Sequence, residues 1–187
     1  SGNTTTQYST YVEPHSYTHA RSYPDASHWI TATEKEITSL DCLGVFCPIG
    51  AEDIPQDANI IGSRLVYKLK KLADGTIDKY KARLCAKGFT EIQGQDYNKT
   101  FAPVSQLTTV RTSAVIALQH RLFAEQADVG TAFWNSKLKY RLYLHLPEGI
   151  KYKGSAFVEL IKSIYGLKQA GHDWNETLNE FILSTDA

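Results

Sequence analysis

The chain has 187 residues, with 20 basic and 20 acidic side chains, so its formal net charge is zero at pH 7. Hydrophobic residues make up 42% and charged residues 21%, which excludes a disordered, collagen-like or highly charged protein. No apolar run approaches the roughly 18–20 residues of a membrane span, and the first ten residues do not resemble a secretory signal. Three cysteines are too few for a disulfide framework, so we expect an intracellular protein without a membrane partner.

The zero net charge conceals an uneven distribution along the chain. Residues 1–63 carry two basic and eight acidic side chains, a balance of −6. Residues 64–87 carry eight basic and two acidic side chains, a balance of +6. A local excess of this size indicates a surface that meets phosphate groups.

The N-terminal part of the chain divides into two segments. Residues 1–24 are rich in Ser, Thr, Tyr and His without periodicity, which predicts a disordered linker or tail. Residues 25–187 are predicted to form one folded domain. It begins with a helix capped by Asp25, whose apolar positions continue to Leu40, and Gly44 ends it.

A β-hairpin is the most readable element. Apolar and charged side chains alternate from Arg64 to Lys71 and again from Lys79 to Lys87, with a turn around Gly75 between them. One face of the hairpin would then be apolar and the other would carry Lys and Arg. Such a face is either a solvated outer surface or a phosphate-binding one. Like charges that lie opposite each other are destabilising, and this favours a bound anion.

The rest of the chain alternates between helical and extended patterns. A loop over 88–106 precedes a helix from Thr108 to Arg121 and a short strand from Phe123 to Val129. Asp128 stands at the end of that strand, where an aspartate is most often a cap or turn residue. Short strands at 142–146 and 156–160 and a C-terminal amphipathic helix follow; the apolar positions of that helix are Trp174, Leu178, Phe181 and Ile182.

Four sequence blocks, taken together and in order, resemble the reverse transcriptases of Ty/copia-type long-terminal-repeat retrotransposons. They are YKARLCAKGF at 80–89, GQDY with TFAPV at 94–104, DVGTAF at 128–133 and KSIYGLKQA at 162–170. The resemblance covers residues 29–183. It implies an α+β fold, namely the fingers and palm of a right-hand polymerase with an antiparallel palm sheet and packed helices.

The same resemblance implies that the chain is truncated. It has no methionine, and it ends before the paired aspartates that complete the metal site of the family. We therefore expect an incomplete palm that is inactive alone. In the parent polyprotein, integrase would precede it, and the remaining palm, thumb and RNase H would follow.

The resemblance implies RNA-directed DNA synthesis, in which two Mg²⁺ ions assist the reaction. The partners would be a template–primer of RNA or DNA and a dNTP. Asp128 matches a catalytic aspartate and would bind metal together with the carbonyl of Val129. Lys81 and Arg83 match the residues that grip the triphosphate. The remaining residues implied to bind nucleotide are Val129, Gly130, Thr131, Ala132, Phe133, Gly166 and Lys168.

Some of these roles have alternatives. Phe133 would exclude a ribose 2′-hydroxyl, or it is a core residue. Lys68, Lys70 and Tyr165 would contact the template.

As a whole, the chain is either part of an active polymerase or a catalytically dead, nucleic-acid-binding remnant. The resemblance places the parent in the cytoplasm, in a virus-like particle, or in the nucleus.

The sequence also departs from the family pattern. Leu65 stands where the family usually has Trp, and Trp134 where it has Leu. Gly171 and His172 replace the usual Pro and Arg, which predicts a weakened structural or template contact at position 172.

Overall fold

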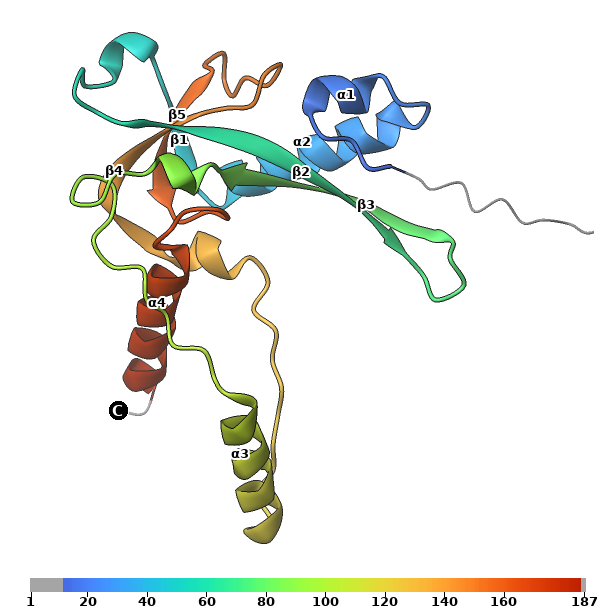
Figure 1. Ribbon diagram of the computed structural model, residues 1–187, viewed down its shortest axis with the longest axis vertical. Coiled ribbons are helices and arrows are strands. Elements are labelled where there is room, and N and C mark those ends of the chain that lie inside the picture. The colour runs from blue at the N-terminus through green and yellow to red at the C-terminus, as the bar shows by residue number, and fades with distance from the viewer. Residues whose placement is uncertain (1–11, 186–187) are drawn as a thin grey trace, which may run out of the picture.

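The computed structural model describes residues 12–185 and shows an α+β fold built on one curled, five-stranded sheet (Figure 1). The strand order is β1-β5-β4-β2-β3. The strands are β1 (Phe46–Ile49), β2 (Ile60–Lys71), β3 (Ile77–Ala86), β4 (Lys137–His145) and β5 (Phe157–Lys162). The helices are α1 (Tyr17–Arg21), α2 (Ala26–Cys42), α3 (Leu107–Gln119) and α4 (Ala170–Thr185), with short 3₁₀ turns η1 (Ala51–Asp53), η2 (Gly88–Thr90) and η3 (Ala132–Asn135).

The sheet is mixed, so the expected antiparallel sheet is confirmed only for three of its four strand pairs. Strand β2 pairs in parallel with β4 over Ile60–Gly62, whereas the β1–β5, β4–β5 and β2–β3 pairs are antiparallel. Beyond Gly62, β2 leaves β4 and continues with β3 as a long two-stranded ribbon (Figure 1). The alternation in the sequence reports which face a residue occupies, but it does not report which strands become neighbours.

The predicted hairpin is confirmed, with the predicted faces. Leu65, Tyr67 and Leu69 of β2 and Ala82 and Leu84 of β3 are buried. The charged positions between them form the other face, and the register sets Lys68 opposite Lys81 and Lys70 opposite Lys79. Two directly opposed Lys pairs on one ribbon repel each other, and a bound anion would reduce this repulsion.

Helix α2 covers the apolar face of this ribbon, in agreement with the predicted helix. Trp29 is fully buried, and its ring meets Tyr67 at 5.3 Å and Tyr80 at 4.6 Å in edge-to-face geometry. The hydroxyl of Thr33 lies 3.0 Å from the Tyr67 hydroxyl. These contacts fix α2 against both strands of the ribbon, β2 and β3.

The N-terminal segment differs from the expectation of a structureless tail. Residues 1–11 lie outside the described residues, but α1 lies within the segment and its Ala20 is fully buried. The carboxylate of Glu13 accepts a hydrogen bond from the Leu69 amide (2.9 Å) and pairs with Lys68 at 3.1 Å. The backbone hydrogen bond from Leu69 is the main cause of a lowered pKa at Glu13. These tertiary contacts could not be predicted, because the segment is short and polar and has no periodicity.

The expected strand from Phe123 to Val129 is wrong, because this segment has no regular structure and Phe123 is 87% exposed. A strand needs a neighbour to bond its backbone groups, and no described strand pairs with these residues. The preceding helix, α3, is present as predicted, but none of its residues is buried and it stands apart from the sheet (Figure 1). Its apolar stripe, Val110 and Leu118 included, faces solvent.

Helix α4 is also present as predicted, although its buried residues are not the predicted apolar ones. Ala170 and Asp173 are buried, Trp174 and Leu178 are half-buried, and Phe181 and Ile182 are exposed. Within the described residues, no helix is long and apolar enough to cross a membrane.

Candidate functional site

A cavity of about 400 Å³ opens where the basic face of β3 meets the segment that leads into η3. It brings together residues that are far apart in the sequence. Its lining consists of Glu36, Lys81, Ala82, Arg83, Asp128, Val129, Gly130, Thr131, Trp134 and Tyr165. Seven of the sequence-predicted site residues therefore share one cavity: Lys81, Arg83, Asp128, Val129, Gly130, Thr131 and Tyr165.

Strand β3 supplies the positive charge of the cavity. Lys81 and Arg83 lie two residues apart in the strand and so point to the same face. Burial is the main cause that lowers the pKa of Lys81, and the nearby charges of Arg83, Lys70 and Lys79 add to it. A cation in this setting is stabilised by any anion that enters the cavity.

A tight turn holds Tyr165 beneath Arg83. The guanidinium carbon of Arg83 lies 5.3 Å from the centre of the Tyr165 ring, and the Phe133 ring meets the same ring at 5.1 Å. The Ala86 amide donates a hydrogen bond to the Tyr165 carbonyl at 2.8 Å. The next residue, Gly166, has φ +92°, and a Cβ there would lie 2.2 Å from the Ala86 carbonyl oxygen. Only glycine allows the two backbones to approach this closely.

The opposite wall carries Asp128 on exposed, irregular backbone. Three residues later, Thr131 adopts a left-handed conformation with φ +56°, although it is β-branched. Its carbonyl accepts the Trp134 amide at 2.9 Å, which starts η3. Strain of this kind in a β-branched residue is uncommon and concentrates at functional sites.

Three lining residues, Glu36, Ala82 and Trp134, were not among the site residues predicted from the sequence. Glu36, on α2, accepts a hydrogen bond from the Leu84 amide at 3.0 Å. Trp134 is 3% exposed, and its indole nitrogen has no hydrogen-bond partner among the described residues. No local pattern marks Glu36, because its place depends on how α2 docks against β3; the departure from the family's Leu was the available signal for Trp134.

Several predicted site residues lie outside the cavity lining. Ala132, Phe133 and Gly166 adjoin it in the chain. Lys68 and Lys70 lie on the neighbouring strand β2, where Lys68 is opposite Lys81 and is paired with Glu13. Lys168 does not line the cavity, and its ammonium group donates a hydrogen bond to the Glu91 carbonyl at 3.1 Å.

Lys168 is exposed, but it bonds to a cluster of buried polar residues that supports the turn. Its amide donates to the Glu91 carboxylate at 2.8 Å, and the Gln169 amide group donates to the Asp96 carbonyl at 3.3 Å. Glu91 and Asp96 are 5% and 2% exposed, and burial is the main cause that raises the pKa of Glu91. The contacts explain the position of Lys168 structurally, without a ligand.

Comparison with known families gives this geometry a context. The profile described as "Reverse transcriptase (RNA-dependent DNA polymerase)" matches residues 51–186. The chain belongs to this reverse-transcriptase family. The match includes the cavity-lining part of β3, the segment from Asp128 to Trp134 and the Tyr165 turn, which form the cavity except for Glu36.

Pol polyproteins of transposons are among the similar curated proteins. The retrovirus-related Pol polyprotein from transposon TNT 1-94 of Nicotiana tabacum is 34% identical over 92% of this chain and 13% of its own length. The Pol polyprotein from transposon RE2 of Arabidopsis thaliana is 36% identical over 70% of the chain and 9% of its own length. The transposon Ty1-ER2 Gag-Pol polyprotein of Saccharomyces cerevisiae is 33% identical over 66% and 7%.

The chain thus spans a small part of these polyproteins. No solved structure matches it significantly.

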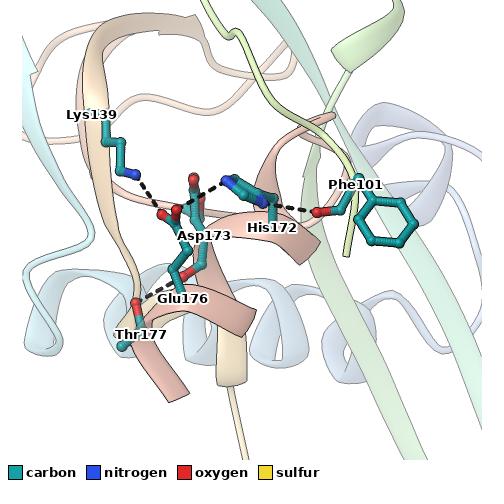
Figure 2. Close-up of polar contacts among 7 residues, drawn as sticks. Phe101, Lys139, His172, Asp173, Glu176 and Thr177 are labelled. Atoms are coloured by element: carbon teal, nitrogen blue, oxygen red, sulfur yellow. Dashed lines mark hydrogen bonds and ion pairs between the residues drawn. The ribbon is translucent and has the colours of Figure 1, made fainter. Parts of the chain in front are cut away.

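Position 172, a departure from this reverse-transcriptase family's usual Arg, keeps a structural contact. His172 Nδ1 lies 2.8 Å from the Phe101 carbonyl oxygen, and Nε2 lies 3.2 Å from a Glu176 carboxylate oxygen (Figure 2). Lys139 of β4 also pairs with Glu176 (Figure 2). The cluster holds Phe101, in the loop that leads to α3, against α4, and the weakened contact at position 172 stays a prediction.

Proposed function

We propose that this chain supplies the fingers and part of the palm of an RNA-directed DNA polymerase, and that the cavity binds the triphosphate of an incoming dNTP. The observation that carries this proposal is the convergence of Lys81 and Arg83 with Asp128 in one cavity. Polymerase chemistry needs positive charge at the phosphates and a carboxylate at the metal, and here segments more than 40 residues apart supply both.

Each residue has a role that follows from its chemistry. Arg83, stacked over Tyr165, would present its planar fork to phosphate oxygens, while Lys81 would act as a point charge. The amides from Gly130 to Ala132 would lie against the phosphates, as backbone donors do in anion-binding turns. Phe133, held by its contact with Tyr165, would lie beside the sugar and exclude a 2′-hydroxyl.

Mg²⁺ fits the oxygen donors of the cavity in part. Asp128 would bind it through its carboxylate and Val129 through its carbonyl, and such hard oxygen ligands suit this ion. When bound, the metal would activate the primer hydroxyl and stabilise the leaving group. The described residues hold no cluster of three metal-ligating side chains, and each Mg²⁺ needs about six oxygens, so we expect the pair of ions only in the parent polyprotein.

The alternative, a remnant that binds nucleic acid without catalysis, rests on the ribbon alone. The basic face of β2 and β3, with Lys68 and Lys70 on its outer part, would follow the phosphate backbone of a template irrespective of sequence. Such a remnant would need no carboxylate at position 128. The two functions therefore differ in their dependence on Asp128.

If the chain is a nucleic-acid-binding remnant, replacing Lys81 and Arg83 together by alanine is expected to weaken binding of a fluorescent RNA–DNA template–primer at least about tenfold at low salt. The slope of log K against log salt should become shallower by about one for each lost phosphate contact. Fluorescence anisotropy at several salt concentrations measures both quantities.

A double variant that removes two exposed cations elsewhere, Lys151→Ala with Arg111→Ala, is the control for net charge. It should leave the affinity within about threefold of the unsubstituted chain, since distant exposed charges are screened. Equal losses in the two double variants would argue against a specific phosphate surface at Lys81 and Arg83.

A further inference from the structure

Glu36 is placed where a phosphate-binding cavity would be expected to avoid negative charge. Its carboxylate accepts a hydrogen bond from the Leu84 amide at 3.0 Å, directly after Arg83 in β3, and the side chain lines the cavity. The neighbouring Glu34, on the same helix, is exposed and does not line it.

The cavity therefore contains two cations and two carboxylates. Lys81 and Arg83 of β3 attract Glu36, and Cys85 lies on the same face of that strand. Asp128 lines the opposite wall, beyond Tyr165. Burial is the main cause that raises the pKa of Glu36, against the attraction of Arg83 and Lys81. A charge that is costly in the empty protein becomes more costly when another anion enters.

We propose that Glu36 is a specificity-determining residue of this cavity, which disfavours a metal-free polyphosphate and so favours a polyphosphate complexed with a divalent cation. The inference rests on the proposed function, because it assumes that Lys81 and Arg83 bind phosphate. It adds a residue from α2, outside the segment that matches the family profile.

The physical reason is the charge balance inside the cavity. A free polyphosphate gains from Lys81 and Arg83 but is repelled by Glu36, and the repulsion is strong because the group is partly buried. A divalent cation on the phosphates cancels part of their charge and reduces that repulsion. The Glu36 carboxylate therefore lowers the affinity for the metal-free polyphosphate more than the affinity for its metal complex.

The substitution Glu36→Gln isolates the charge. Glutamine has nearly the same shape, and its amide oxygen can still accept the Leu84 amide, so the docking of α2 is retained. Glu34→Gln is the matched control, since it removes the same charge from the same helix outside the cavity. The probe is inorganic tripolyphosphate, titrated by calorimetry into the full chain with and without Mg²⁺.

Glu36→Gln should tighten metal-free tripolyphosphate about three- to tenfold and the Mg²⁺ complex by less, so that the preference for the complex falls. Glu34→Gln should change both affinities less than about twofold. The inference is overturned if the two variants behave alike, or if Glu36→Gln weakens binding or tightens both forms equally. If the unsubstituted chain binds neither form, phosphate binding itself fails, and the inference falls with it.

Discussion

Replacing Gly166 by alanine is expected to lower the free energy of unfolding by about 3 kcal/mol or more, a large effect for one methyl group. The backbone of Gly166 has φ +92°, which an L-residue rarely adopts, and the added Cβ would lie 2.2 Å from the Ala86 carbonyl oxygen. Neither atom is the end of a flexible side chain, so the turn has to move away from β3. The hydrogen bond from Ala86 to Tyr165 would be lost with it.

Gly154→Ala separates the clash from the backbone strain. Gly154 has φ +88°, but a Cβ there would meet no atom within 4 Å. We expect it to cost only the strain of the positive φ, about 1 kcal/mol. Urea denaturation followed by circular dichroism measures both variants. Equal losses would mean that the close approach of the turn to β3 is not a stabilising feature of this fold.

Trp29→Ala is expected to cost about 3–5 kcal/mol of folding free energy and to loosen α2 from the hairpin. The Trp29 side chain is fully buried and meets two aromatic rings, Tyr67 and Tyr80, that belong to different strands. Its removal leaves a cavity at the centre of the α2–hairpin contact. The hydrogen bond of Glu36 to Leu84 depends on that contact, so amide exchange at Leu84 should accelerate.

Thr31→Ala tests whether the effect is local to the core. Thr31 lies two residues away on the same helix and is exposed, so we expect a change within about 0.5 kcal/mol. Thermal unfolding and hydrogen exchange provide the comparison. Trp29→Ala with an unchanged midpoint would contradict the packing of α2 against the hairpin.

The elements that the sequence predicted well are those with strict periodicity. The alternation from Arg64 to Lys71 and from Lys79 to Lys87 determines both the hairpin and its two faces, because the side-chain period of a strand is two. Helices α2, α3 and α4 are also present as predicted, but the apolar stripe of α3 faces solvent and Phe181 and Ile182 of α4 are exposed. The local pattern predicts the helix, but it does not predict what covers its apolar face.

The wrong or missing predictions concern contacts between distant segments. The alternation at 123–129 is real, but the described residues provide no partner strand for it. The parallel pairing of β2 with β4 joins residues about 80 positions apart, and nothing local specifies it. The buried Ala20 and the Glu13 contacts arise in a segment whose composition resembles a tail.

The candidate site shows the same division. Family motifs predicted Lys81, Arg83 and Asp128 as site residues, and the fold gathers them in one cavity, whereas their roles stay predictions. The motif also suggested Lys168, whose ammonium and amide groups instead bond to Glu91. Glu36 was not predicted as a site residue, because it reaches the cavity only through the docking of α2 against β3.

The central claim is that a dNTP and its metal bind between Asp128 and the cations of β3. Mn²⁺, which also accepts oxygen ligands, can replace Mg²⁺ as a paramagnetic probe in NMR spectra of the ¹⁵N-labelled chain. With dNTP present, we expect selective broadening of the amide signals of Lys81, Arg83 and Gly130 but not of Gly154. We expect this broadening to disappear in Asp128→Asn. Broadening that persists in Asp128→Asn, or that centres on another part of the chain, would contradict the account.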